Sequence, residues 1–307
     1  MNISVSNLTY QSSENCQLTG YKWTSDEKAI GLIVLVHGMA EHIERYEEFA
    51  NFLVTKGYIV YGYNQRGHKG SILSYDDYGY MSDEDNFSAM LHDIDLVVDD
   101  AKKTYPDLPV YLFGHSMGSF LSTRYIELHS VKLNGAIICG TGLSPLPVLK
   151  LGRFFAKGIM KSNGRRYRSE FINNLAFGSY NKKFEKRTDC DWLNRNQEEI
   201  DKYVADKYCG GIFTVSFFHD FFNCMIDIQK NFDIIPREFP ILLISGTMDP
   251  VGGYGKQVTK LYKKLRSKGF SDVIEILYKD ARHEILKELD KKQTLEDVNF
   301  WLEKHNK

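Results

Sequence analysis

The sequence predicts an α/β protein with a mostly parallel central sheet, helices on both faces of the sheet and a helical cap insertion. Three observations lead to this prediction. Short apolar runs alternate with segments of helical periodicity. The central runs are apolar throughout, which is typical of strands buried on both faces. Strand signals disappear between residues 142 and 239, where helical segments rich in aromatic and basic residues take their place.

The individual elements follow the same signals along the chain. The first 30 residues indicate two antiparallel strands, and later strands are expected at 32–36, 58–63, 110–113, 136–139, 241–245 and 273–278. Helices are expected at 45–57, with Gly57 as a C-terminal cap, at 86–106, where Pro106 ends the helix, and at 120–129, 254–269 and 295–305. The predicted organisation is therefore a core of residues 1–141 and 240–307, interrupted by a cap of residues 142–239.

Composition narrows the classes of function. A formal net charge of −1 over 307 residues offers no general attraction to nucleic acid. The five cysteines include no C-x-x-C pair, which argues against a disulfide framework or a zinc site and favours a reducing compartment. The first residues lack a signal-peptide pattern, and no apolar run approaches the ~20 residues that span a bilayer. We therefore expect a cytoplasmic protein without a metal, a cofactor or a nucleic-acid partner.

The stretch Gly114–Gly118 reads G-H-S-M-G and lies between an apolar strand and a helix. A G-x-S-x-G sequence in this setting is a nucleophile elbow, in which Gly114 and Gly118 let the strand and the helix approach closely. The turn presents the hydroxyl of Ser116 and directs free amides of the helix start at the substrate. A simple glycine-serine loop would also match five residues, but the flanking strand and helix favour a nucleophile.

A serine needs a base, and in enzymes built on this elbow the acid and the histidine follow the serine in the chain. Asp249 follows the apolar run 241–245, and His283 follows the run 273–278. Asp280 is a weaker candidate for the acid because it is a close neighbour of His283 that more often caps a turn. His115, inside the elbow, is given no role as a base.

The oxyanion of an acyl-transfer intermediate requires hydrogen-bond donors that are already in place. One expected donor is the backbone N–H of Met117, which follows the nucleophile. The second is the backbone N–H of Met39, in the loop after the run 32–36. In that loop, His37 is expected to brace the backbone and Gly38 to allow it to approach the site.

Several segments together resemble a known family. They read LVHGMAEHIERYEEFANFL, NQRGHKGS, PVYLFGHSMGS, SGTMDPVGGYGKQV and YKDARHEILKEL. From about residue 32 to the end, the chain resembles the monoglyceride lipase and lysophospholipase branch of the α/β-hydrolase fold, close to the serine-aminopeptidase-like hydrolases. The resemblance implies a catalytic triad of Ser116, Asp249 and His283, with Met39 and Met117 as oxyanion amides. Asn64 and Ser119 depart from the family pattern, where aspartate and glycine are commoner.

The expected function is hydrolysis of carboxylic esters through an acyl-enzyme, with monoacylglycerols or lysophospholipids as substrates. A serine nucleophile favours acyl transfer to water over the aspartate chemistry of related epoxide hydrolases. A serine aminopeptidase or amidase is the main alternative, and an amine-binding carboxylate such as Glu185, Glu198 or Glu199 would favour it. A non-catalytic ligand-binding protein on the same fold is a further alternative, which the intact triad opposes.

Two stretches of the cap bear on the substrate. Residues 153–168 combine basic and apolar side chains, as in segments that make weak contact with anionic membrane surfaces, although a solvated face of the cap is the simpler interpretation. In residues 212–228, Phe218, Phe222 and Met225 share one helical face. They are candidate contacts for an acyl chain, while most residues of this apolar stretch are expected to pack in the core.

Overall fold

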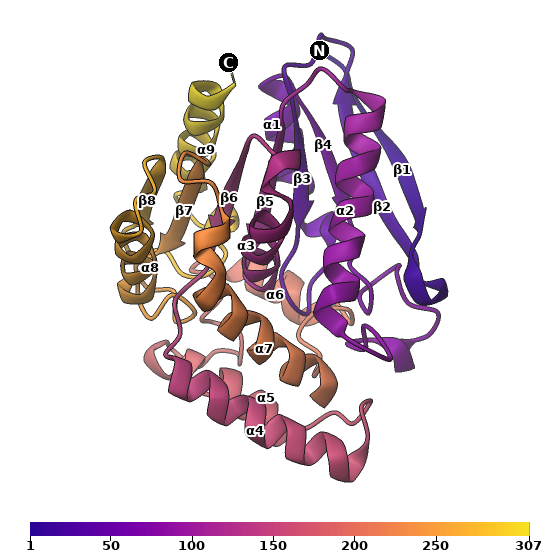
Figure 1. The fold of residues 1–307 in the computed structure, drawn as a ribbon, viewed down its shortest axis with the longest axis vertical. Coiled ribbons are helices and arrows are strands. Elements are labelled where there is room, and N and C mark those ends of the chain that lie inside the picture. Colours follow the sequence, from indigo (N-terminus) through magenta and orange to yellow (C-terminus); the bar gives the residue numbers. More distant parts are fainter. Residues whose placement is uncertain (307) are drawn as a thin grey trace.

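The computed structural model describes residues 1–306. Its centre is one eight-stranded sheet in the order β1-β2-β4-β3-β5-β6-β7-β8 (Figure 1). β1 pairs with β2 and β2 with β4 in antiparallel fashion, and the remaining neighbours are parallel. The mostly parallel sheet and the N-terminal antiparallel pair are thus confirmed. The strands are β1 (Ile3–Gln11), β2 (Gln17–Ser25), β3 (Gly31–Val36), β4 (Tyr58–Tyr63), β5 (Val110–His115), β6 (Gly135–Cys139), β7 (Ile241–Gly246) and β8 (Val273–Tyr278).

Five helices cover the two faces of the sheet. They are α1 (Glu47–Thr55), α2 (Asn86–Thr104), α3 (Met117–His129), α8 (Lys256–Ser267) and α9 (Lys291–His305). Side chains of β3 alternate between the faces: Ile33 and Leu35 join the buried cluster that contains residues of α1 and α9, whereas Val34 joins the cluster of α2, α3 and α8. Burial on both faces explains why the strand sequences are apolar without alternation.

The ends of two helices illustrate how local sequence sets the elements. α1 is followed by Gly57 at φ 92°, a backbone conformation that suits glycine at a helix end. α3 begins at Met117, three residues before the start that the sequence indicated. The turn at Ser116 leads directly into helical backbone, so the small elbow residues, which carry no helical periodicity, already belong to the helix.

Between β6 and β7 the chain forms α4 (Leu146–Asn163), α5 (Glu170–Phe177), α6 (Gln197–Ala205) and α7 (Val215–Asn231). The part of the chain that the structure describes has no strand in this interval, although Arg168 and Thr214 form an isolated bridge. α7 packs against α2, α3 and α4, and α4 and α5 lie farthest from the sheet in Figure 1. The division into a core and a 142–239 cap itself stays a prediction.

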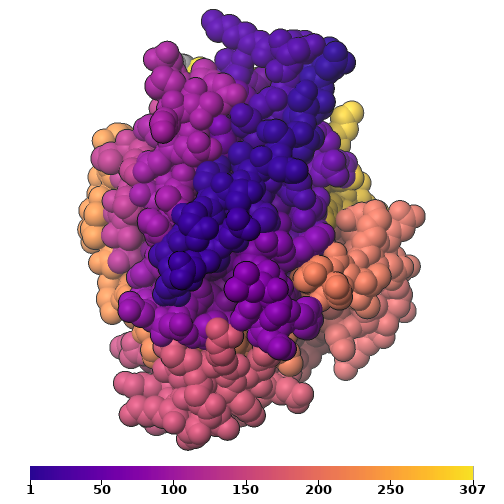
Figure 2. Space-filling view, turned by 90° about the vertical axis from the view of Figure 1, so that its right-hand side faces the viewer, coloured from indigo at the N-terminus to yellow at the C-terminus, as the bar shows by residue number. Residues whose placement is uncertain are grey.

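The molecular surface reflects this arrangement. The N-terminal hairpin of β1 and β2 forms one edge of the sheet and runs along the face shown in Figure 2, with residues of the 142–239 segment below it and to its right. Within residues 1–306, no helix has both the length and the apolar character needed to cross a membrane.

Candidate active site

Ser116 occupies the sharp turn between β5 and α3. Its backbone has φ 55° and ψ −121°, a conformation that costs a non-glycine residue about 1–3 kcal/mol and persists only where the surroundings impose it. Two hydrogen bonds do so here. The Ser116 N–H donates to the carbonyl of Cys139 at 2.9 Å, and the Ser119 hydroxyl donates to the carbonyl of Ser116 at 2.6 Å. Ser119, which departs from the family pattern, therefore supports the turn.

The elbow glycines stand where no side chain fits. A Cβ atom on Gly114 would lie 2.3 Å from the carbonyl oxygen of Gly118 and from Ser122 Oγ. A Cβ atom on Gly118 would lie 2.2 Å from the carbonyl oxygen of Val36 on β3. Both contacts are far inside van der Waals distance, so the close packing of strand, turn and helix requires glycine at these positions.

Asp249 and His283 come together at the carboxyl ends of β7 and β8. His283 Nδ1 lies 3.0 Å from Asp249 Oδ2, and both side chains are buried. Asp249 also accepts hydrogen bonds from Ser245 Oγ at 3.0 Å and from the Val251 N–H at 2.8 Å, which fix the carboxylate. Asp280, the alternative acid, is exposed at φ 60° in the turn before His283. Asp249 is thus the carboxylate that holds the imidazole.

A cavity of about 150 Å³, here called the inner cavity, brings the serine and the histidine together; its lining includes Ser116, His283, Met39 and Trp192. The Trp192 ring lies against the imidazole of His283, with centroids 5.1 Å apart. Ser116 Oγ and His283 both lie in the described residues and are not hydrogen-bonded in this structure. In many hydrolases the bond between serine and histidine tightens only when substrate is bound. Sequence patterns gave no signal for Trp192, which lies in an irregular segment.

The loop after β3 approaches the serine closely. A Cβ atom on Gly38 would lie 3.1 Å from Ser116 Cβ, and the Gly38 N–H donates to Glu41 Oε1 at 2.7 Å. His37 Nε2 accepts from the Gln65 N–H at 3.0 Å, so this histidine braces the loop. Asn64 contributes as well, because its Oδ1 accepts from the Ile43 N–H at 2.9 Å.

A buried charge network supports this loop from behind. Glu41 Oε1 lies 3.1 Å from His115 Nδ1, and Arg45 bridges Glu41 at 2.8 Å and Glu284 at 2.6 Å. Burial by itself would raise the pKa of Glu41, but His115 and Arg45 beside it hold that pKa well below its usual range. Burial would lower the pKa of His115, yet the hydrogen bond and charge of Glu41 raise it. His115 Nε2 also lies 3.3 Å from the carbonyl of His283, next to the candidate base.

A second cavity, of about 230 Å³ and mostly apolar, also has Ser116 in its lining and is here called the apolar cavity. Of the three candidate acyl contacts, Phe222 and Met225 line it together with Ser116. Phe218 is instead fully buried against Phe177 and Phe217, and the neighbouring Phe221 lines the cavity. Phe218 lies one helical turn before Phe222 on the same face of α7, where the rings of Phe177 and Phe217 cover it, so it does not line the cavity.

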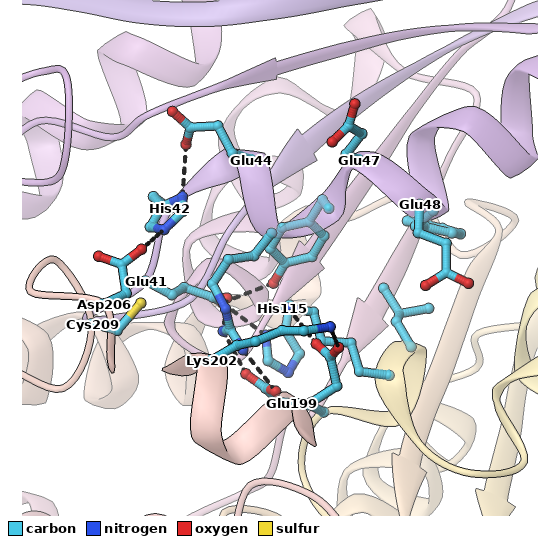
Figure 3. A pocket seen from close by; sticks show the side chains of 16 residues that line it. Glu41, His42, Glu44, Glu47, Glu48, His115, Glu199, Lys202, Asp206 and Cys209 are labelled. Atoms are coloured by element: carbon cyan, nitrogen blue, oxygen red, sulfur yellow. Dashed lines mark hydrogen bonds and ion pairs between the residues drawn. The ribbon is translucent and has the colours of Figure 1, made fainter. Parts of the chain in front are cut away.

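A third cavity, of about 380 Å³, is strongly charged and is here called the polar cavity (Figure 3). It shares Glu41, His115 and Glu284 with the inner cavity. Its outer wall carries residues from the loop after β3 and from the region of α6, among them His42, Glu44, Asp206 and Cys209. Ser116 thus lines the apolar and the inner cavity, and the inner cavity adjoins the polar one at the three shared residues.

The parallel sheet, the strained serine turn and the buried Asp249–His283 pair define a serine hydrolase of the α/β-hydrolase class. The chain belongs to the serine aminopeptidase S33 family, whose model matches residues 27–290. It is 26% identical over 284 residues to the monoglyceride lipase of Mus musculus, covering 91% of this chain and 84% of that protein. The monoacylglycerol lipase of Mycolicibacterium smegmatis is 25% identical over 303 residues, which cover 92% and 91% of the two chains.

Solved structures share the fold at lower sequence identity. A thermostable carboxyl esterase from Bacillus coagulans, in complex with glycerol, superposes with a TM-score of 0.92 at 24% identity and covers 99% of each chain. A soluble variant of the monoglyceride lipase from Saccharomyces cerevisiae, in complex with a substrate analogue, gives a TM-score of 0.76 at 19% identity, covering 98% of this chain and 96% of that chain.

Proposed function

We propose that this protein hydrolyses monoacylglycerols, with lysophospholipids as the next candidate substrates, through an acyl-enzyme on Ser116. The observation that carries the proposal is the position of Ser116, which lines both the apolar and the inner cavity. An ester bound at the serine can place its acyl chain along Phe222 and Met225 and its alcohol toward the inner cavity. The relatives named as monoglyceride lipases support this substrate class.

The mechanism follows from the contacts. Ser116 Oγ attacks the ester carbonyl while His283 Nε2 takes the hydroxyl proton. Asp249, held by Ser245 and Val251, keeps Nδ1 of His283 protonated and stabilises the imidazolium. His283 then gives the proton to the leaving alcohol oxygen, and water repeats the sequence on the acyl-enzyme to release the fatty acid.

Backbone amides are proposed to hold the oxyanion of both tetrahedral intermediates. Met117 is the first residue of α3, so its N–H has no acceptor within the helix and lies at the positive end of the helix dipole. Met39 lines both the inner and the apolar cavity, and its N–H is the second proposed donor. Removing one donor from such a site typically costs about 10²–10³ in kcat.

The aminopeptidase alternative needs a carboxylate that is available to an ammonium group. The family description supports this activity, but the charges do not favour it. Glu41 and Glu284, which line the inner cavity, both pair with Arg45. Of the candidates indicated by the sequence, Glu199 pairs with Lys202 at 2.6 Å. Glu185 and Glu198 are exposed and do not line the inner cavity.

Two measurements test the proposal. A fluorophosphonate probe should label the wild-type protein and leave Ser116→Ala unlabelled, and equal labelling of both would remove Ser116 as the nucleophile. A panel of monoacylglycerols, lysophosphatidylcholine, p-nitrophenyl esters and aminoacyl nitroanilides should show the highest kcat/KM for monoacylglycerols. A preference for the anilides would replace the lipase proposal with the peptidase one.

We further propose that the 142–239 segment caps the site of a cytoplasmic enzyme and touches membranes weakly. α4 and α5 expose a cluster of apolar side chains beside basic ones on α4; the apolar ones are Val148, Leu151, Phe154, Phe171 and Leu175. Apolar helix surface with cationic neighbours favours an anionic lipid surface, and an acyl substrate would reach the apolar cavity from there. The five unpaired cysteines support the cytoplasm, a reducing compartment, as the proposed location.

Sedimentation with vesicles tests the membrane contact. Phe154→Ser should weaken binding to vesicles that contain anionic lipid, because Phe154 is 70% exposed on α4. Phe300→Ser is the matched control, since Phe300 is also 70% exposed but lies on α9, at the opposite end of the molecule in Figure 1. Equal binding by both variants and the wild type, or binding that ignores lipid charge, would contradict the proposed contact.

A further inference from the structure

Three potential metal ligands meet at the outer wall of the polar cavity. The ligand atoms of His42, Asp206 and Cys209 all lie within 4.8 Å of one another. Figure 3 shows the His42 ring between two carboxylates, with the sulfur of Cys209 beside Asp206. His42 Nε2 lies 2.8 Å from Asp206 Oδ2, while Nδ1 lies 2.7 Å from Glu44 Oε2. These residues come from segments 164 positions apart, so no spacing in the sequence indicates the cluster.

The set of donors suits one class of ion. Imidazole nitrogen, carboxylate oxygen and thiolate sulfur together favour zinc and related divalent transition metals over calcium or magnesium, which prefer oxygen. A tetrahedral zinc ion with bonds of about 2.0–2.3 Å spaces its ligand atoms about 3.3–3.6 Å apart, so the three atoms need only small movements to surround one. Neutral His42 with anionic Asp206 and Cys209 also balances the charge of the ion.

The surroundings resemble those of bound zinc in a second respect. A histidine that ligates zinc usually donates its other ring N–H to a carboxylate, which fixes the tautomer and orients the ring. Glu44 is placed to accept that bond from Nδ1 and leaves Nε2 to face Asp206. Asp206 is itself fixed, because its Oδ1 accepts from the Tyr208 N–H at 2.8 Å. The polar cavity beside the cluster leaves room for water as the fourth ligand.

We propose that His42, Asp206 and Cys209 form a binding site for zinc or a similar divalent transition metal at the mouth of the polar cavity. Binding forms bonds from the metal to Nε2, to a carboxylate oxygen and to sulfur, and releases to water the thiol proton and any proton on Nε2. The ion would join the loop after β3, which carries Met39, to the segment after α6. It would thereby act as a clamp on the loop that supplies a proposed oxyanion amide.

Metal titration of the metal-free protein tests the site without reference to catalysis. Cobalt(II) should bind one ion per chain and produce the near-ultraviolet absorption of a cobalt–thiolate bond, and zinc should displace it. Cys209→Ser should abolish that absorption and weaken zinc binding at least tenfold. Asp206→Asn should weaken binding to a similar extent, and Glu44→Gln should weaken it about 10–100-fold, as expected for a residue that orients a ligand.

Controls separate this site from other thiols and from the proposed function. Cys16→Ser removes another half-buried cysteine, on the N-terminal hairpin, and should bind cobalt as the wild type does. Ser116→Ala should also bind normally, so failure of the hydrolase proposal would leave this one standing. Melting temperatures in metal-free buffer show that each variant is folded. No thiolate absorption in the wild type, or equal binding by wild type and Cys209→Ser, would show that His42 is only an ion-pair partner of two carboxylates.

Discussion

Replacing Asp249 by asparagine tests the proposed catalytic geometry most directly. The asparagine oxygen would keep the bond from the Val251 N–H, since the opposite orientation would set two N–H groups against each other. The new NH2 group would then face His283 Nδ1, 3.0 Å away, and donate to it. The imidazole would have to carry its proton on Nε2, the atom that must accept the proton of Ser116.

The expected magnitude follows from this tautomer. The same replacement in a Ser-His-Asp triad lowers kcat about 10⁴-fold, which at 1.36 kcal/mol for each factor of ten is about 5.4 kcal/mol of transition-state stabilisation. Initial rates with a p-nitrophenyl ester measure kcat, and a melting curve verifies that the variant is folded. Asp280→Asn is the matched control, because Asp280 is exposed three residues from His283 and should leave kcat unchanged. A loss below tenfold in Asp249→Asn, or an equal loss in both variants, would refute the reasoning.

Three other outcomes are expected. Gly118→Ala should prevent stable folding, since the new Cβ would lie 2.2 Å from a backbone oxygen. Gly158→Ala within α4 places a Cβ with nothing within 4 Å and should raise the free energy of unfolding by about 1 kcal/mol. Urea titrations measure both free energies, and equal stability of the two variants would contradict this expectation. Burial lowers the pKa of His37 from 6.5 to about 4, so the unfolded chain binds more protons and stability should fall by about 3 kcal/mol as the pH drops from ~6.5 to ~4. In urea titrations at several pH values across that range, the unfolding free energy of His37→Gln should depend less steeply on pH than that of the wild type. An unchanged pH dependence would dismiss this role of His37. Met225→Trp should reduce kcat/KM for long-chain p-nitrophenyl esters more than for the butyrate, and equal reduction would remove Met225 from the acyl path.

The sequence predicts the sheet well because burial on both faces leaves a local signature in each strand. It also predicts the Asp249–His283 pair, since the carboxyl ends of neighbouring parallel strands lie at one edge of the sheet. The start of α3 is less predictable from the sequence. The elbow residues are small because strand, turn and helix pack closely there, and small residues carry no helical periodicity.

Contacts between distant segments leave no such signature. Arg45 and Glu284 are 239 residues apart, and only the spacing of Glu41 and Arg45, four residues apart within one segment, indicates part of that network. For α7, periodicity correctly groups Phe218, Phe222 and Met225 on one face. Which side chains of the helix line the cavity depends on the residues packed against each of its turns, so Phe221 lines it and Phe218, covered by Phe177 and Phe217, does not.

The carbonyl of Ala40, directly after Met39, accepts hydrogen bonds from the Tyr203 hydroxyl and from the Gly210 N–H, each at 3.0 Å. Ala40 itself sits at φ 54°, a conformation that alanine rarely adopts without such restraint. The backbone next to Met39, whose N–H is a proposed oxyanion donor, is therefore shaped by residues from α6 and the segment after it. A chimaera that carries the 142–239 segment of a relative on this sheet would therefore change the loop after β3 as well as the substrate contacts. Keeping residues 203–210 of this chain in the chimaera would preserve the two hydrogen bonds to Ala40.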